Sequence, residues 1–221
     1  MKPKPWQMIA VGTVVAAAAA YLWVTGSFSR WTGEKHAAPG PPASSATTGR
    51  PAHMDWQTIN RPDDGFKVSM PAAPTDFQVP AYNETGTTEP VHMLICRPDA
   101  DTTFAISWED NPPVARVNDR DPKKTLDMAR DGMLSRTQTT LVNEKDDTVA
   151  GHPARDITAH NTEGGLLDAR LIYTGDRLYT MIAVFPNSGS RRQEDVTRFF
   201  GSFAASQEPG TALPEAAAPT H

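Results

Sequence analysis

Three short stretches of the sequence hold side chains that could do chemistry. The first is AGHPARDITAH, residues 150–160, which places two histidines, an arginine and an aspartate close together. The second is the carboxylate pair Glu109–Asp110, and the third is the single cysteine, Cys96. Carboxylates and histidines can act as general acids, general bases or metal ligands, and a thiolate can act as a nucleophile. What each stretch can do depends on the element that positions it.

Within this first stretch, residues 154–160 show the period-two pattern of a β-strand, and His152 lies in the turn before it. Ile157 and Ala159 share one face, and polar residues share the other. The loop NTEGG joins this strand to the next one. Around it we expect three cross-strand pairs: His160–Leu166, Thr158–Asp168 and Asp156–Arg170. The last is a cross-strand ion pair, which is common in sheets and does not by itself indicate a function. His152 and His160 would lie roughly 26 Å apart in an extended chain, too far to share a metal ion.

The other two stretches also favour structure over chemistry. Glu109 and Asp110 are neighbours at the end of a predicted strand, so their carboxylates should point to opposite faces. Cys96 has no second cysteine for an internal disulfide or a cysteine-based zinc site, and we expect it to be a small buried side chain. The sequence contains no G-x-S-x-G, no H-E-x-x-H and no phosphate loop. We therefore predict no catalytic residue, no metal site and no cofactor.

The acidic balance of the chain argues against nucleic acid as a partner. The formal net charge is −5 and the pI is about 5.7. No run of Lys or Arg is longer than two residues. Because binding to a phosphate backbone needs a basic face, we expect no nucleic-acid partner.

The first thirty residues predict a membrane segment. Lys2 and Lys4 precede an uncharged stretch, 5–29, whose apolar part, 8–24, would span roughly 25 Å as a helix. Aromatic residues near both ends fit the membrane interface. The lysines favour a cytoplasmic N-terminus, which would place the rest of the chain outside the cytoplasm. We expect an uncleaved anchor, and a signal peptide cleaved before Ser27 is the alternative.

The chain divides into four parts by composition. We predict an anchor at 1–33, a Pro/Ala/Ser/Thr-rich disordered tether at 34–53, a globular domain at 54–206 and a disordered tail at 207–221. The expected location is the bacterial inner membrane, with a single-pass anchor and the globular domain in the periplasm. The alternative is a cleaved form that is secreted.

Within the globular part, alternating hydrophobicity predicts strands at 66–70, 75–80, 91–98, 102–110, 154–160, 166–174 and 177–185. The last strand is apolar on both faces and should be central. One helix should begin at Asp121–Pro122, and another should be capped by Ser190 with Gln193 in a capping box. An apolar stripe on this final helix needs a sheet to cover. The order predicts an α+β fold, an antiparallel β-sheet flanked by helices, preceded by one N-terminal transmembrane helix.

The C-terminal half carries a family resemblance. It reads GHPARDI…LLDARLIYTGDRLYTMIAVFP…EDVTRFFGSF, with a Gly-x-Pro turn, a GDRLY hairpin and a closing helix that ends in RFF-x-SF. The region from Phe66 to Phe203 resembles the PsbP-like α/β/α sandwich of exported bacterial proteins, also seen in DcrB-type periplasmic lipoproteins. The resemblance implies a domain that binds and supports other proteins. Its marked residues belong to the fold, so it implies no catalytic residue. The chain departs from the lipoproteins in having an apparent anchor and no acylated cysteine.

Together these features predict a membrane-tethered, extracytoplasmic protein-interaction or assembly domain of an envelope complex. Two long polar connections, 80–90 and 111–120, are the expected contact surface, together with the strand end beside them. The candidate residues on this surface are Tyr82, Glu84, Glu109, Asp110, Arg116 and Arg120.

Two other functions stay open at this point. One is a small-ligand-binding domain or an enzyme with a cleft between sheet and helix near Trp108 and Tyr179. The other is a purely structural domain within a larger machine.

Overall fold

A computed structural model describes residues 54–82, 88–110, 121–175 and 177–206 of the chain. The strands in this part are β1 (Gln57–Arg61), β2 (Phe66–Met70), β3 (Thr75–Tyr82), β4 (Thr88–Cys96), β5 (Thr103–Asp110), β6 (Thr140–Val149), β7 (His152–His160), β8 (Leu166–Tyr173), β9 (Arg177–Phe185) and β10 (Ala204–Ala205). The helices are α3 (Pro122–Thr137), the short 3-10 helix η3 (Ser188–Ser190) and α4 (Gln193–Gly201).

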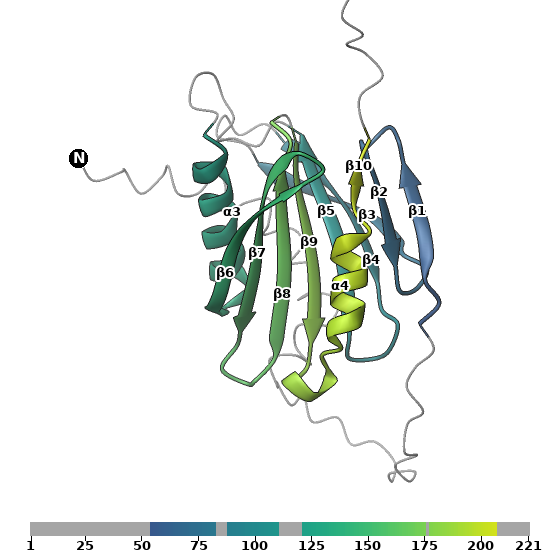
Figure 1. The fold of residues 1–221 in the computed structure, drawn as a ribbon, viewed down its shortest axis with the longest axis vertical. Helices are drawn as coiled ribbons and strands as arrows, with labels where there is room; N and C mark the ends of the chain where they lie inside the picture. The colour runs from purple at the N-terminus through teal and green to yellow at the C-terminus, as the bar shows by residue number, and fades with distance from the viewer. Residues whose placement is uncertain (1–53, 83–87, 111–120, 176, 207–221) are drawn as a thin grey trace, which may run out of the picture.

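Two antiparallel sheets form the domain (Figure 1). The large sheet has seven strands in the order β3-β4-β5-β9-β8-β7-β6. The small sheet has three strands in the order β1-β2-β10, so it joins the first strands of the domain to the last one. Strand β9 lies at the centre of the large sheet, as its two apolar faces predicted. The predicted α+β architecture, an antiparallel sheet with helices on it, is confirmed.

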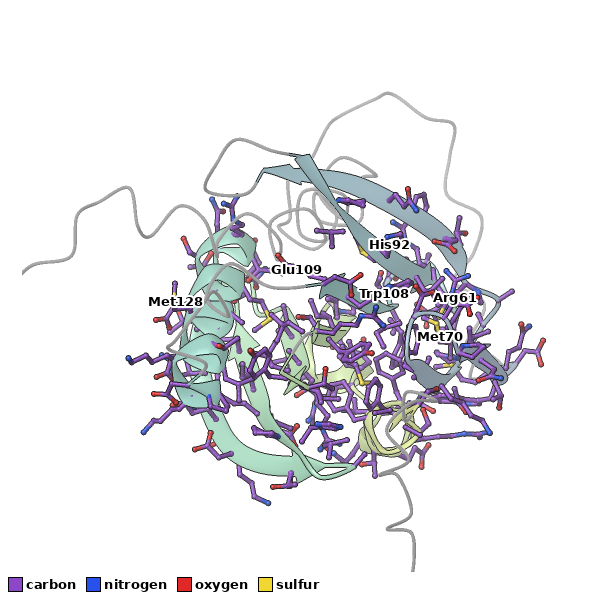
Figure 2. All side chains as sticks on the ribbon, turned by 90° about the horizontal axis from the view of Figure 1, so that it is seen from above. Arg61, Met70, His92, Trp108, Glu109 and Met128 are labelled. Atoms are coloured by element: carbon purple, nitrogen blue, oxygen red, sulfur yellow. The ribbon has the colours of Figure 1, made fainter. Side chains whose placement is uncertain are left out.

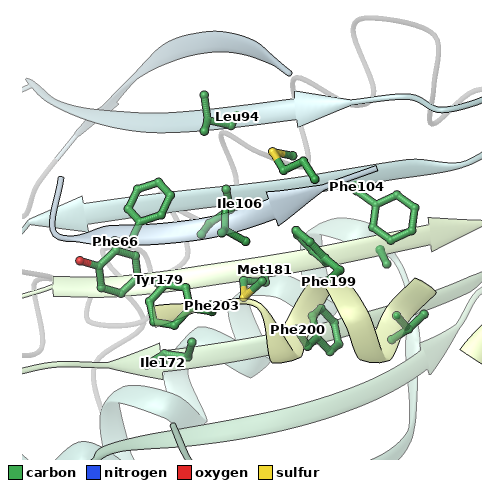
Figure 3. Packing of buried hydrophobic residues seen from close by; sticks show 14 of the residues in the cluster. Phe66, Leu94, Phe104, Ile106, Ile172, Tyr179, Met181, Phe199, Phe200 and Phe203 are labelled. Carbon is green, nitrogen blue, oxygen red and sulfur yellow. The ribbon is translucent and has the colours of Figure 1, made fainter. Parts of the chain in front are cut away.

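The two faces of the large sheet carry separate cores. On one face, α3 lies over β7 and β8 and buries Leu126, Ala129 and Met133 against the sheet. On the other face, α4 and the small sheet cover β5 and β9 (Figure 3). Alternate residues of β9 face the two cores: Leu178, Ile182 and Val184 on the α3 side, and Tyr179, Met181, Ala183 and Phe185 on the α4 side. This alternation is what the sequence predicted.

The predicted register of β7 and β8 is correct at every position. His160 lies opposite Leu166, Thr158 opposite Asp168, and Asp156 opposite Arg170. Asp156 and Arg170 form the expected ion pair, with Nε 2.6 Å from Oδ1. The loop length and the polar–apolar alternation were enough to set this register.

Four strand predictions need correction. Strands β1, β6 and β10 were not predicted, because β1 and β10 are short and β6 carries four successive charged residues, 144–147, with little apolar alternation. The connection expected over 80–90 is shorter, since β3 extends to Tyr82 and β4 begins at Thr88. Pro80 lies opposite Pro90 in this hairpin. Neither proline has an N–H, so the pair fits a non-hydrogen-bonded position of the ladder.

One of the two predicted helix starts is confirmed, and the other is wrong. Asp121 caps α3, and its Oδ1 accepts a hydrogen bond from the Lys123 N–H at 3.0 Å. Ser190 does not cap α4, because it ends the η3 turn. There Asn187 Oδ1 accepts from the Ser190 N–H at 3.1 Å, and the N-cap of α4 is Arg192. The stripe Val196, Phe199, Phe200 and Phe203 is buried as predicted.

The predicted anchor, tether and tail lie outside the described residues. Within the part of the chain that the structure describes, no helix is long and apolar enough to span a membrane.

Candidate functional site

The end of the large sheet where β5 stops is the candidate site, because both predicted contact segments are attached there. Strand β5 ends at Asp110, directly before 111–120, and the β3–β4 hairpin turns between Tyr82 and Thr88. Pairing between β4 and β5 runs only from His92 towards Cys96, so the hairpin continues past this pairing as a two-stranded ribbon. We call this end of the sheet, formed by the ribbon, the end of β5 and the start of β9, the loop end.

The six candidate contact residues differ from one another in where they lie and how exposed they are. Tyr82 is the last residue of β3 and pairs with Thr88. Asp110 is exposed and forms an ion pair with Arg177 at the start of β9. Glu109 and Asp110 point to opposite faces of the sheet, as the alternation predicted. Glu109 lies on the α3 side, opposite Leu178, and is only 5% exposed, so it adds little surface. Three further candidates lie outside the described residues: Glu84, Arg116 and Arg120.

Beside the loop end, Trp108 is enclosed by a cluster that the sequence did not predict. The Arg61 guanidinium lies 5.4 Å from the centre of the indole, and the His92 ring stacks on it at 5.3 Å and 15°. Phe66 packs against the same ring at 5.0 Å. The indole Nε1 donates to Asp64 Oδ1 at 3.0 Å. Figure 2 shows Arg61, His92 and Trp108 lying together, with Glu109 nearer to α3.

Arg61 connects the small sheet to the large one. Its Nε lies 3.0 Å from Asp64 Oδ2, and a terminal nitrogen pairs with Asp76 on β3. Two carboxylates therefore offset the guanidinium charge, while its face covers Trp108. Because the indole itself is only 1% exposed, it offers no stacking platform for a ligand. This cluster holds the layers in position.

The turn between β1 and β2 is fixed against β9 by Tyr179. The tyrosine hydroxyl donates to the Asp64 carbonyl at 2.9 Å. Burial raises the pKa of Tyr179, so its hydroxyl stays protonated at neutral pH and can donate. Gly65 has a φ of +73° and lies so close that a Cβ there would be 2.8 Å from the tyrosine oxygen. Only glycine fits this approach without a shift.

The cleft considered near Trp108 and Tyr179 is filled by side chains. Tyr179 packs edge-on against Phe66 at 5.7 Å and against Phe203 at 5.1 Å between ring centres. Trp108 and Tyr179 are almost fully buried. The aromatic packing in Figure 3 occupies the region between β9, β2 and the end of α4. These observations do not favour a ligand site at this place.

Within the polar stretch 150–160, strand β7 has ion pairs on both faces. Arg155 is 3% exposed and pairs with Asp127 on α3 and with Asp146 on β6 at 2.9 Å. On the opposite face, Asp156 pairs with Arg170. The two histidines of this stretch lie at opposite ends of β7. Across the described ranges, no three His, Cys, Asp or Glu side chains group as metal ligands.

Sequence reasoning missed Arg61, Asp64 and His92 for a physical reason. Arg61 and Asp64 come from β1 and the β1–β2 turn, and only the packing of the small sheet on the large one brings them to Trp108. His92 lies directly opposite Trp108 on the neighbouring strand β4, so its contact follows from the β4–β5 register. The two strands predicted around the turn at 98–101 are the signal that could have placed it.

Comparison with known proteins adds fold-level similarities to this α+β domain. No protein-family model matches the chain, and no curated protein matches it significantly. The solution structure of cyanobacterial PsbP (CyanoP) from Synechocystis sp. PCC 6803 is similar with a TM-score of 0.48 and 14% identity, over 75% of this chain and 99% of that chain. A crystal structure of a protein of unknown function from Pseudomonas aeruginosa, named as a candidate regulator, has a TM-score of 0.31 and 13% identity, over 54% of this chain and 86% of that chain.

With TM-scores below 0.5, neither structure carries an argument about fold, family or function. The PsbP-like resemblance and the likeness to DcrB-type proteins stay predictions.

Proposed function

We propose that this chain is a membrane-tethered, extracytoplasmic interaction domain, and that its loop end binds a protein partner of a bacterial envelope complex. One observation carries the proposal. The ribbon of β3 and β4 and the end of β5 lie at the same end of the large sheet, so the two segments predicted for contact start from that one end. Segments that extend from a rigid sheet are common binding elements.

The rigidity of the scaffold supports a role in binding. Both faces of the large sheet carry filled apolar cores, and the small sheet is held to it by the Trp108 cluster. A rigid surface loses little conformational entropy when it binds, which favours recognition of a preformed partner.

The membrane location is part of the same proposal and rests on the sequence. The uncharged stretch 5–29 after two lysines supports an inner-membrane anchor with the domain in the periplasm. A relation to the PsbP-like and DcrB-type proteins is likewise proposed on the GHPARDI, GDRLY and RFF-x-SF stretches.

The test is site-specific photocrosslinking of the full-length chain in its native membrane. A photoreactive residue replaces Asp110 in one variant and Asp101 in a matched control. Both aspartates are exposed and flank β5, at its opposite ends. We expect one reproducible crosslinked protein from position 110 and none from position 101. The same products from both positions, or no product from 110, would contradict a binding surface at the loop end.

A further inference from the structure

The described strands leave three long edges open, and only one of them lacks protection against pairing with another strand. These edges are β6 and β3 in the large sheet and β1 in the small sheet. The remaining edge strand, β10, has only two residues. Natural proteins usually protect an open edge with charges, prolines or bulges, because its free N–H and C=O groups can template a new strand.

Strand β6 is well protected. Its register shifts between Leu141 and Asn143, which marks a bulge. Its centre, 144–147, reads Glu-Lys-Asp-Asp. In a two-fold antiparallel pairing, the residue on the axis meets its own copy, so any register centred on these residues sets like charges against each other.

Strand β3 is protected by Pro80. This residue occupies a non-hydrogen-bonded position of the β3–β4 ladder, so its backbone nitrogen faces the open edge. Since proline has no N–H, the edge lacks one of its outward donors, in the second half of the strand.

Strand β1 has none of these features. Its sequence is QTINR, and its pairing with β2 is regular over all five residues. The side chains of Thr58 and Asn60 are exposed, and β1 is the outermost strand of the small sheet (Figure 1). The only charge, Arg61, is paired with Asp64 and Asp76.

The backbone direction of β1 follows from Ser69. The Ser69 N–H donates to Ser202 Oγ at 2.8 Å, and the Ser69 carbonyl oxygen lies 3.4 Å from the same Oγ. Both groups of Ser69 therefore point away from β1. Because Ser69 lies opposite Thr58, this pair is not hydrogen-bonded, and the N–H and C=O groups of Thr58 and Asn60 point to the open edge.

We propose that the β1 edge pairs with β1 of a second copy of this chain, across a two-fold axis at Ile59. In this register Thr58 lies opposite Asn60 of the other copy, and the two residues exchange backbone hydrogen bonds. Ile59 meets Ile59 as an apolar pair. Arg61 lies opposite the uncharged Gln57, so no like charges meet. The two small sheets then form one six-stranded antiparallel sheet, and the two loop ends face opposite directions.

The pairing can be trapped with a disulfide in the full-length chain. An Ile59→Cys variant places two thiols at a non-hydrogen-bonded pair, where the Cα atoms of antiparallel strands lie about 4.5 Å apart, within disulfide range. The native Cys96 gives little background, because it is 3% exposed and burial raises its pKa to about 12. Mild oxidation should give a linked dimer from Ile59→Cys and none from the wild type. The control is Val142→Cys on β6, which is 59% exposed and would link more readily by random collision.

Two further substitutions test the hydrogen bonds. In the Ile59→Cys background, Asn60→Pro removes an outward N–H from each copy, whereas Asn60→Ala keeps it. We expect Asn60→Ala to retain the dimer and Asn60→Pro to reduce its yield about tenfold, in line with the loss of two hydrogen bonds. If Asn60→Pro lowers the melting temperature, Thr58→Lys/Asn60→Lys replaces it, since it changes only exposed side chains and sets lysine against lysine.

The proposal is overturned by equal dimer yields from the Ile59→Cys and Val142→Cys variants, or by a dimer that survives both edge variants. A disulfide that links the Ile59→Cys variant to a different protein would also overturn it, because the β1 edge would then bind another partner.

Discussion

At the scale of single residues, Gly65 controls how the β1–β2 turn meets β9. A Cβ at this position would lie 2.8 Å from the Tyr179 oxygen and 2.9 Å from an Arg177 nitrogen. We expect Gly65→Ala to lower the free energy of unfolding by about 2–4 kcal/mol, from left-handed strain and the displaced Tyr179 hydrogen bond. Urea unfolding measures this change.

Gly164→Ala is the matched control. Gly164 also has a positive φ, +87°, but nothing lies within 4 Å of its Cβ position. Its free energy of unfolding should fall only by the cost of the left-handed strain, about 1–2 kcal/mol. Equal losses in the two variants would mean that the Tyr179 contact contributes nothing.

The candidate site shows what residue types and spacing can reveal. The opposite directions of Glu109 and Asp110 follow from strand alternation alone. The burial of Glu109 does not, because it depends on how the α3 side of the sheet is covered. The cation–aromatic contact of Arg61 with Trp108 depends on the packing of the small sheet on the large one, which no local pattern encodes.

At the scale of elements, α3 is held to β7 by a charge pair whose strength depends on pH. The hydrogen bond from Arg155 lowers the pKa of Asp127, although partial burial opposes this shift. A lowered pKa in the folded state stabilises the protein above the usual carboxyl pKa, and this stabilisation is lost as the pH falls through the folded value. We expect Asp127→Asn to destabilise the domain at pH 7 by about 0.5–1 kcal/mol, since the carboxylate is partly exposed.

The free energies of unfolding of the wild type and Asp127→Asn should approach each other as the pH falls from about 5 towards 2. This range includes the unfolded carboxyl pKa of about 3.9 and ends below it. Urea unfolding across this range measures both free energies. Asp131→Asn is the control on the same helix, since Asp131 is highly exposed and contacts Arg130 rather than Arg155. A constant difference at all pH values would argue against the ionised Asp127 as the source.

Elements could be predicted where burial leaves a regular pattern in the sequence. The β7–β8 register and the two faces of β9 follow from alternation and loop length. Strand β6 could not be predicted in this way, because an exposed edge strand needs no apolar face and its charges serve the ion pairs to Arg155 and Arg170. The start of α4 was misplaced because Asn187 makes the capping bond one turn earlier.

At the scale of the whole molecule, the first and last segments of the domain pair and pack against each other. Strand β10 pairs with β2, and the Ser206 N–H donates to the Gly65 carbonyl at 2.8 Å. Phe66 from the first segment stacks on Phe203 from the last, with ring centres 6.3 Å apart and planes at 11°. The small sheet was not predictable from sequence, since it is assembled from short strands at the two ends of the domain.

Because the first and last segments of the domain contact each other, we expect the domain to unfold as one unit. Phe203→Ala should cost about 3–5 kcal/mol, because it leaves a cavity among packed aromatic rings. Phe66→Ala should cost a similar amount, and the double variant should cost less than the sum by about 0.5–1.5 kcal/mol, the coupling of a stacked pair. Val142→Ala, at an exposed position, should change stability by less than about 0.5 kcal/mol.

Two probes distinguish a single unit from a detachable hairpin. Far-UV circular dichroism follows the large sheet. Intrinsic tryptophan fluorescence also reports on the small sheet, because Trp56 lies beside β1 and Trp108 contacts Arg61 and Asp64. In the wild type and in each variant, both signals should change at the same urea concentration. Separate transitions, or additive losses in the double variant, would mean that β1 and β2 dock on the large sheet independently of the C-terminal segment. Such a hairpin could then open while β3 to β9 stay folded, and the two ends of the domain would not stabilise each other.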